Sequence, residues 1–195
     1  MEIKKYFEVL WKWKSIFSLT FGTVVLAVGL FTVASTPVYE TTSKLIILPS
    51  ANVFTDYNDV RSAITALDNN SVVNTYAEIA KSSTILDAAI NEIALKSPDD
   101  YQIMSDVESQ TSVITITVDG PDPNGVYMLA NAISTHTIAY VSDYFEVYNL
   151  QQLDKAVLPK QPIQPTVMLN MALAVILGLG AGIVFAYLSE YLIVD

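Results

Sequence analysis

Residues 170–189 read NMALAVILGLGAGIVFAYLS, a stretch without a single charged side chain. The uncharged run as a whole covers 161–189, and a second such run covers 15–39. Each run is longer than the roughly 20 residues that an α-helix needs to cross the hydrocarbon core of a bilayer. The sequence therefore predicts a membrane protein with two transmembrane helices, over 15–38 and 165–189.

The segment before the first predicted span indicates how the chain is oriented. Four lysines precede this span against two glutamates, and Trp11 and Trp13 lie next to it. Lysine favours the cytoplasmic side and tryptophan the membrane interface, so we expect cytoplasmic ends at 1–14 and 190–195 in a multi-pass protein of the cell (plasma or inner) membrane. A cleaved signal peptide is the alternative for the first span, but the apolar part of a signal peptide runs only about 7 to 15 residues.

The segment between the spans, 39–164, is long enough for one extracytoplasmic domain with a buried core. It carries 16 of the 20 Asp and Glu residues of the chain and six of the 10 Lys and Arg residues. This acidic balance disfavours a nucleic-acid partner, because phosphate backbones require basic surfaces. The chain has no cysteine, so disulfides and thiol chemistry are excluded and the domain must be held together by packing.

The second predicted span carries a small residue at every fourth position, at Ala174, Gly178, Gly182 and Ala186. Residues four apart share one face of a helix, and a face of small residues lets another helix approach closely. We expect this small-residue ridge to be a helix-packing surface. It could join the two spans of one subunit or the spans of neighbouring subunits, and both remain open at this point.

Periodicity divides 39–164 into strands and helices. Stretches rich in β-branched and aromatic residues predict strands, and apolar residues three and four apart predict helices. Asp122-Pro123 is typical of a helix start, with Asp as the cap and Pro in the first turn. We expect an α+β domain with a small membrane-proximal sheet and a long helix. The expected order is strand 39–48, helices 59–81 and 84–96, a short helix capped by Ser97, strand 112–118, helix 123–149 and a returning strand over 150–158.

No catalytic, cofactor or metal site is expected in this domain. Only Gly120 and Gly125 lie between the spans, which is too few for a glycine-rich phosphate-binding loop. The single histidine, His136, falls in the middle of a predicted helix with no nucleophile or metal-ligand motif around it. The acidic pair Asp99-Asp100 is explained by the start of a helix. We therefore predict a protein that is not an enzyme and uses no cofactor.

Three prolines precede the second span at a spacing of three, at Pro159, Pro162 and Pro165. Three residues is the period of a polyproline II helix, so the three rings are expected to lie on one ridge. A segment of this kind has little chain entropy to lose and can act as a stiff strut. The alternative is an ordinary proline-rich linker that leads into a helix.

Several of these features, taken in order, resemble the chain-length determinant (Wzz-type) polysaccharide co-polymerases, especially their small capsule and exopolysaccharide members. Each feature is weak alone, but the order and spacing together are fairly specific, and the resemblance extends over nearly the whole chain. The residues that carry it are the basic, Trp-containing N-terminal segment, Pro37-x-Tyr39-Glu40 before a strand that ends Leu45-Ile46-Ile47-Leu48, Asp122-Pro123 followed by Leu129-Ala130-Asn131, and Pro159-x-x-Pro162-x-x-Pro165 before a glycine-bearing span.

The resemblance implies a homo-oligomeric ring of two-span subunits that sets the chain length or export of a surface polysaccharide, such as a capsule, an exopolysaccharide or O-antigen. It implies a separate polysaccharide polymerase as partner, and often a cytoplasmic tyrosine kinase, within the lipid bilayer. The competing interpretations are an extracytoplasmic sensor or receptor with two spans and a two-span pore subunit.

Overall fold

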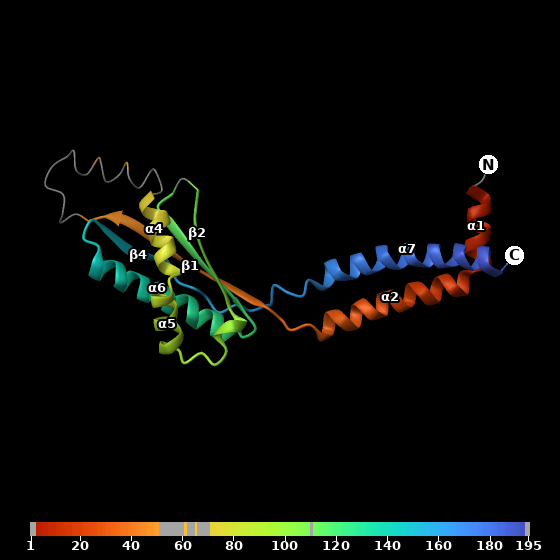
Figure 1. Cartoon of the computed structure of the whole chain (residues 1–195), viewed down its shortest axis with the longest axis horizontal. Helices are drawn as coiled ribbons and strands as arrows, with labels where there is room; N and C mark the ends of the chain where they lie inside the picture. The colour runs from red at the N-terminus through yellow and green to blue at the C-terminus, as the bar shows by residue number, and fades with distance from the viewer. Residues whose placement is uncertain (1–2, 51–60, 62–64, 66–70, 110, 194–195) are drawn as a thin grey trace. The chain divides into compact units, whose positions relative to one another are not determined.

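The computed structural model describes residues 3–50, 61, 65, 71–109 and 111–193. The chain divides into two compact units (Figure 1). We call the described residues up to Pro37 and from Gln164 onward the helical unit, and Val38–Ile163 the α+β unit. Each unit is considered by itself.

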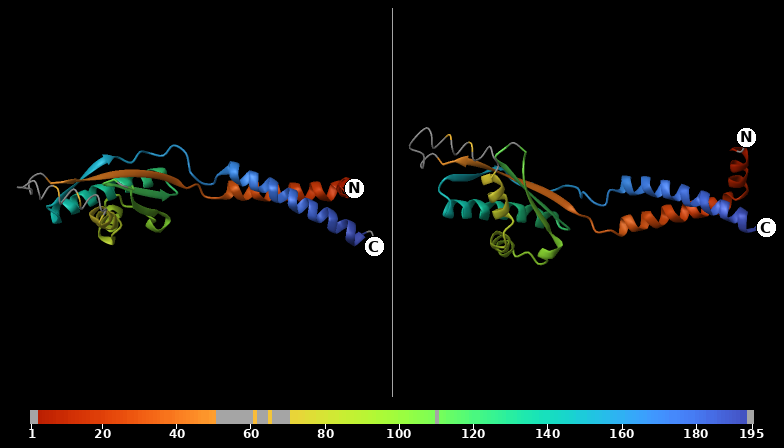
Figure 2. Two further views of the ribbon diagram at one scale, coloured as in Figure 1. Left: turned by 90° about the horizontal axis from the view of Figure 1, so that it is seen from above. Right: turned by 45° about the horizontal axis from the view of Figure 1, so that its top comes forward.

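The helical unit consists of three helices. These are α1 (Ile3–Lys12), α2 (Lys14–Ala34) and α7 (Val167–Ile193). Helices α2 and α7 lie side by side in the views of Figures 1 and 2. Both are long and apolar enough to cross a membrane, with mean hydropathies of 2.2 and 2.3.

The ends of the two long helices differ from the predicted span limits. Helix α2 ends at Ala34, before Pro37, because proline disfavours a helical conformation in the residue that precedes it. Helix α7 continues past Glu190 to Ile193, since the Glu190 carboxylate accepts hydrogen bonds there from Lys12 and Trp13. The sequence analysis did not predict α1.

The α+β unit is built on one four-stranded antiparallel sheet in the order β2-β3-β1-β4. Its strands are β1 (Tyr39–Pro49), β2 (Gln102–Val107), β3 (Val113–Gly120) and β4 (Tyr148–Asp154). The helices among its described segments are α4 (Ser71–Ala80), α5 (Ser83–Glu92), the short 3₁₀ helix η1 (Pro98–Asp100) and α6 (Pro123–Tyr144). Helices cover one face of the sheet, as the two views of Figure 2 show.

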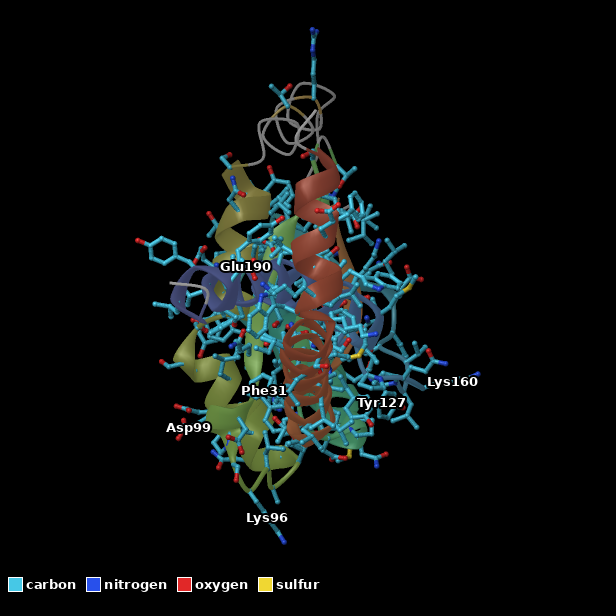
Figure 3. All side chains as sticks on the ribbon, turned by 90° about the vertical axis from the view of Figure 1, so that its right-hand side faces the viewer. Phe31, Lys96, Asp99, Tyr127, Lys160 and Glu190 are labelled. Carbon is cyan, nitrogen blue, oxygen red and sulfur yellow. The ribbon has the colours of Figure 1, made fainter. Side chains whose placement is uncertain are left out.

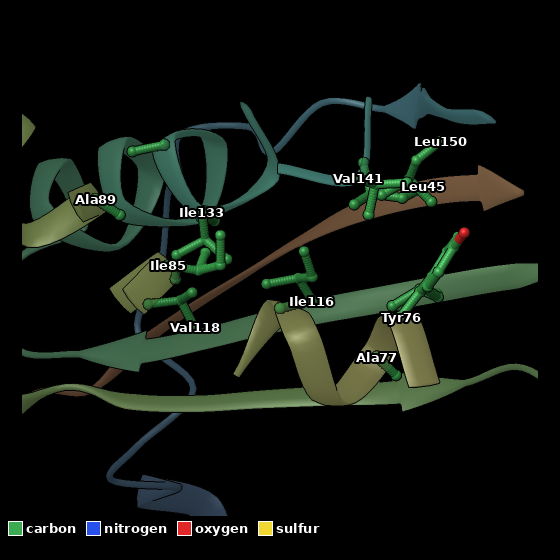
Figure 4. Packing of buried hydrophobic residues seen from close by; sticks show 14 of the residues in the cluster. Leu45, Tyr76, Ala77, Ile85, Ala89, Ile116, Val118, Ile133, Val141 and Leu150 are labelled. Atoms are coloured by element: carbon green, nitrogen blue, oxygen red, sulfur yellow. The ribbon is translucent and has the colours of Figure 1, made fainter. Parts of the chain in front are cut away.

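The core of this unit follows the two-residue period of the strands. Leu45 of β1 and Ile116 and Val118 of β3 are fully buried on the helix-covered face, in one core cluster with Leu129 and Ile133 of α6. Figure 4 shows part of this cluster, including Ile133. Burying one such side chain stabilises the fold by about 1.5–3 kcal/mol. The intervening residues of β1, such as Glu40 and Thr42, are exposed on the opposite face.

The predicted α+β class and the principal strands are confirmed. Strand 39–48 corresponds to β1, and strand 112–118 to β3. The helix from Asp122-Pro123 is present, and Asp122 caps it by accepting hydrogen bonds from the backbone N–H groups of Asn124 (3.3 Å) and Gly125 (2.8 Å).

Other boundaries were wrong. The helix predicted over 123–149 ends at Tyr144, because Tyr148–Asp154 pairs with β1 as strand β4. The returning strand therefore starts and stops earlier than 150–158. Strand β2 was not predicted at all. The helix predicted over 59–81 lies partly outside the described residues, which contain α4 as its last part.

Candidate functional site

The small-residue ridge of α7 packs against α2 of the same chain. Ala174 and Ala186 are completely buried. A Cβ atom added at Gly178 would lie 2.9 Å from the ring of Phe21, and one added at Gly182 would lie 2.8 Å from the ring of Phe17. The two glycines therefore make room for aromatic rings from the first predicted span.

The aromatic side of this contact is regular. The Phe17 and Phe21 rings stack with centroids 6.3 Å apart and planes at 4°. The carbonyl oxygens of the same two residues would lie 3.2 and 3.4 Å from Cβ atoms at Gly182 and Gly178, so the backbones of the two helices also come close. By contrast, a Cβ at Gly180 would meet nothing within 4 Å. The ridge accordingly has one packed face, at the positions that the fourfold spacing singled out.

A polar contact ties the two helices near the start of α2. The Glu190 carboxylate of α7 forms an ion pair with Lys12, 2.7 Å from its Nζ, and accepts a hydrogen bond from Trp13 Nε1. Glu190 is labelled in Figure 3. A charge in an apolar helix is costly unless it is paired, so this pairing explains how α7 includes Glu190.

A second polar contact ties the opposite ends of the pair. Asn170 Nδ2 donates to Thr32 Oγ1 at 3.2 Å, and the Thr32 hydroxyl in turn donates to the carbonyl of Val28 at 2.8 Å. Thr32 is buried. The helix pair is thus held by apolar packing along its length and by side-chain hydrogen bonds at both ends.

In the α+β unit, Asn131 connects α6 to the chain that leaves β4. Its Oδ1 accepts a hydrogen bond from the N–H of Ala156 at 3.1 Å, and its Nδ2 donates to the carbonyl of Ala156 at 3.3 Å. Nδ2 also donates to the carbonyl of Tyr127 at 2.9 Å. One side chain therefore satisfies both backbone groups of a buried residue outside the sheet.

Beyond Ala156 the chain runs beside the beginning of β1. Thr41 Oγ1 donates to the carbonyl of Val157 at 2.8 Å, and the N–H of Ile163 donates to the carbonyl of Val38 at 2.8 Å. Pro159 and Pro162 lie between these two contacts, and Pro165 belongs to the helical unit. The first and last residues of the α+β unit are thereby joined to each other.

A buried polar cluster supports the same region. Ser43 of β1 and Ser134 of α6 share a hydrogen bond of 2.8 Å, and Gln152 Nε2 donates to Ser43 Oγ at 2.8 Å. The pairing of β1 with β4 shifts register between Lys44 and Leu45. Gln152 Nε2 also donates to the carbonyl of Lys44 at 3.2 Å. The cluster therefore provides a hydrogen bond to the Lys44 carbonyl at the register shift between β1 and β4.

Tyr101 explains the two glycines of this unit, which sequence reasoning had counted without giving them a role. A Cβ atom at Gly120 would overlap the Tyr101 ring, and one at Gly125 would overlap its hydroxyl. Burial, followed by the charges of Asp122 and Asp100, raises the pKa of Tyr101. The ring therefore joins η1, the end of β3 and the start of α6.

The acidic residues form no convergent catalytic arrangement in the described part of the chain. Glu108 pairs with Lys44 at 2.6 Å and accepts from Thr115 at 3.1 Å, and these contacts lower the pKa of Glu108. Burial raises the pKa of Asp119, whose Oδ1 is buried without a hydrogen-bond partner. Asp99 belongs to η1, where the Ser97 side chain makes no cap hydrogen bond.

His136 has one acidic neighbour. Its Nε2 lies 2.6 Å from Glu92 Oε2, although the geometry does not satisfy a hydrogen bond. Among the described residues, no three His, Asp or Glu side chains gather in a way that could hold a metal ion.

Two surface cavities lie on the α+β unit. One, of about 380 Å³, is lined by Tyr127, Asn131 and Lys155 among others. The other, of about 490 Å³, is lined by four aromatic residues, Tyr76, Tyr144, Phe145 and Tyr148, together with Val72, Thr75, Glu146 and Val147. Burial raises the pKa of Tyr76 to about 12, so its phenol stays protonated at neutral pH.

Comparison with known proteins links this architecture to one family. Residues 1–93 match the family model described as chain length determinant protein, Wzz. A probable capsular polysaccharide biosynthesis protein, YwqC of Bacillus subtilis, is 30% identical over 168 residues, which cover 82% of this chain and 64% of the relative. The capsular polysaccharide biosynthesis protein CpsC of Streptococcus agalactiae is 27% identical over 177 residues, which cover 86% of this chain and 74% of the relative. The chain thus spans 64% of the length of the first of these relatives. Residues 1–93 of this chain therefore carry a chain length determinant (Wzz) domain.

Proposed function

We propose that this chain is a non-enzymatic membrane scaffold that regulates the chain length or export of a surface polysaccharide. The observation that carries the proposal is the match of residues 1–93 to the chain length determinant family. The names of the two relatives favour a capsular polysaccharide.

The structure supports a role that depends on shape. The α2–α7 pair is closed by the Phe17 and Phe21 rings and pinned at both ends by polar contacts. In the α+β unit, Asn131 and the contact between Val38 and Ile163 hold the entering and leaving chain segments together. A scaffold needs such rigid parts, because it influences a partner only through the positions at which it holds surfaces.

The proposed partners are other copies of this chain, arranged in a ring, and a polysaccharide polymerase in the same membrane. The sides of α2 and α7 that face away from each other expose large apolar residues, including Leu26, Leu30, Ile176 and Leu177. These surfaces suit lipid, neighbouring subunits or a membrane-embedded polymerase. A cytoplasmic tyrosine kinase is a further proposed partner.

Both termini are proposed to lie in the cytoplasm, because lysines precede α2. The chain has no cysteine, so single cysteines can report topology. A cysteine in place of Asp99 should react with a membrane-impermeant thiol reagent in intact cells, and one in place of Glu8 should not. The reverse labelling pattern would refute this orientation.

The function is tested by deleting the gene and analysing the surface polysaccharide. We expect the distribution of polymer lengths to change while the sugar composition and linkages stay the same, because a scaffold does not alter the chemistry of the repeat unit. An unchanged distribution would contradict the proposal and favour the sensor interpretation. Cleavage or transfer of sugars by the purified chain alone would contradict its non-enzymatic character.

A further inference from the structure

Helix α1 carries an apolar surface that the described part of the chain leaves uncovered. Phe7 and Trp11 are 68% and 77% exposed, and they lie one helical turn apart on the same side of α1. Glu8 and Lys12, also one turn apart, occupy a different side. Val9 and Leu10 are half-buried. The helix is therefore amphipathic and shows two large side chains to its surroundings.

The position of α1 within the helical unit limits what those side chains can meet. Helix α1 ends at Lys12 and α2 begins at Lys14, so α1 ends where a membrane-crossing helix reaches the bilayer surface. Figures 1 and 3 show α1 turned sharply away from the direction of α2. A helix that leaves a spanning helix in this way runs along the membrane surface instead of continuing away from it.

The charge of this segment fits one kind of surface. Lys4, Lys5, Lys12 and Lys14 lie within the first 14 residues, whereas the chain as a whole has a net charge of −10. Glu190 neutralises Lys12. Lys14 remains exposed, with its Nζ 5.7 Å from the centroid of the Trp11 ring. An aromatic side chain with a lysine beside it suits the boundary between acyl chains and phosphate groups.

We infer that α1 is an interfacial helix that inserts Phe7 and Trp11 into the bilayer surface and that the segment recognises anionic lipid headgroups through Lys4, Lys5 and Lys14. The continuity of α1 with a membrane-crossing helix and the complementarity between lysine and lipid phosphate support this inference. The inference does not depend on the role in polysaccharide synthesis, because it concerns only how the chain meets the membrane.

The experiment uses the full chain in lipid nanodiscs. The chain has two tryptophans, so Trp13→Phe leaves Trp11 as its only tryptophan, which is excited selectively in nanodiscs with a tryptophan-free belt protein. Nanodiscs of phosphatidylcholine are compared with nanodiscs that contain about 30% phosphatidylglycerol. Quenching by bromines on the acyl chains reports insertion of Trp11, and quenching by aqueous iodide reports its exposure to water.

We expect acyl-chain bromines to quench Trp11 and the iodide quenching constant to fall at least about threefold relative to free tryptophan. Protection should be greater with phosphatidylglycerol, and Lys4→Gln, Lys5→Gln and Lys14→Gln together should abolish that difference. Phe7→Asp should expose Trp11 to iodide, whereas Glu8→Ala, which removes no apolar side chain from α1, should not. Anionic lipid repels iodide and so lowers iodide quenching by itself. Acrylamide, a neutral quencher, must therefore rank the lipids and the variants in the same order.

Free access of acrylamide to Trp11 in both lipids would overturn the inference and indicate that α1 docks on a protein. Insertion that is equal in both lipids and unaffected by the three Lys→Gln changes would overturn recognition of anionic headgroups. To test the second apolar position of α1 independently, the same measurement is made with Phe7→Trp in a chain that carries Trp11→Phe and Trp13→Phe. That tryptophan should show the same protection.

Discussion

The side-chain amide of Asn131 pairs with both backbone groups of Ala156, 25 residues further along the chain, accepting from its N–H at 3.1 Å and donating to its carbonyl at 3.3 Å. Ala156 is 3% exposed, and an unsatisfied buried backbone group is costly. Asn131 thus supplies the two backbone hydrogen bonds that a neighbouring strand would supply to a residue inside a sheet.

Asn131→Ala should destabilise the α+β unit by about 1–3 kcal/mol, because both polar groups of Ala156 lose their partner. Asn131→Asp keeps an acceptor for the Ala156 N–H but loses the donor, so its effect should be smaller. Urea or thermal unfolding of the purified full chain measures both changes. Asn124→Ala, at an exposed position near the start of the same helix, is the control and should change stability little. Equal effects of Asn131→Ala and Asn124→Ala would show that the pairing contributes nothing.

The ridge on α7 should tolerate a large residue only where the structure is open. Gly178→Leu and Gly182→Leu should each displace a phenylalanine ring of α2 and weaken the helix pair, with contacts of this kind worth about 1 kcal/mol each. Gly180→Leu meets open space and is the matched control. Cysteine pairs placed across α2 and α7 measure the packing by their disulfide yield, which should fall in the first two variants and stay high in the third. Equal yields in all three would mean that the ridge is incidental.

The contact of Tyr101 with two glycines predicts a selective rescue. Gly120→Ala and Gly125→Ala should both lower the unfolding temperature, since each Cβ would overlap Tyr101. The nearest atom to Gly125 is the Tyr101 hydroxyl, but the nearest atoms to Gly120 belong to the ring. Tyr101→Phe should therefore recover part of the stability of Gly125→Ala and none of that of Gly120→Ala. Gly22→Ala, which meets nothing within 4 Å, should be nearly neutral. Rescue of both glycine variants alike would contradict this geometry.

Two carboxylates on the sheet should respond to pH in opposite directions. The folded-state pKa of Glu108 is lowered by Lys44 and Thr115, so its contribution to stability is present above its ordinary pKa of 4.5 and is lost as the pH falls through the folded value. The folded-state pKa of Asp119 is raised by burial. Its contribution is therefore present below its ordinary pKa of 3.8 and is lost as the pH rises through the folded value.

Glu108→Gln should accordingly lower the unfolding temperature at pH 7, and Asp119→Asn should raise it. The difference for Asp119→Asn should shrink toward zero below the ordinary pKa of 3.8, and the difference for Glu108→Gln should shrink as the pH falls through the lowered folded-state pKa of Glu108. Unfolding curves recorded from pH 3 to pH 7 test the two signs. A loss of stability at neutral pH in Asp119→Asn would indicate that its carboxylate has a partner after all.

Local patterns predicted the elements whose signals are contained in their own residues. The uncharged runs identified α2 and α7, alternation identified β1 and β3, and Asp122-Pro123 identified the start of α6. Strand β2 was missed because Gln102-Ile103-Met104-Ser105-Asp106-Val107 has few β-branched residues, and it becomes a strand by pairing with β3. The end of α6 was extended too far, because the pairing of β4 with β1 involves residues about 100 positions apart.

In the candidate site too, features signalled by local sequence were predicted and contacts between distant residues were not. Small residues at every fourth position predicted a ridge on α7. Phe17 and Phe21, which pack against it, lie more than 150 residues earlier, and the sequence around them does not indicate which helix they contact. Asn131 was singled out only through a resemblance, and its pairing with Ala156 depends on the tertiary fold. Tyr101 was overlooked. Helix α1 could have been found, since Phe7 and Trp11 already lie four residues apart in the sequence.

If the shape of this chain regulates polymer length, variants that change this shape should alter the length distribution of the surface polysaccharide in cells. Pro159→Ala, Pro162→Ala and Pro165→Ala together restore backbone freedom to the segment that joins the two units, and Gly178→Leu with Gly182→Leu opens the helix pair. With protein levels equal to wild type, we expect a shifted or broadened length distribution in both of these strains. The Gly180→Leu strain should give wild-type lengths, and the sugar composition should be unchanged in all three strains. Wild-type length distributions in both variant strains, at normal protein levels, would contradict regulation of polymer length by this shape.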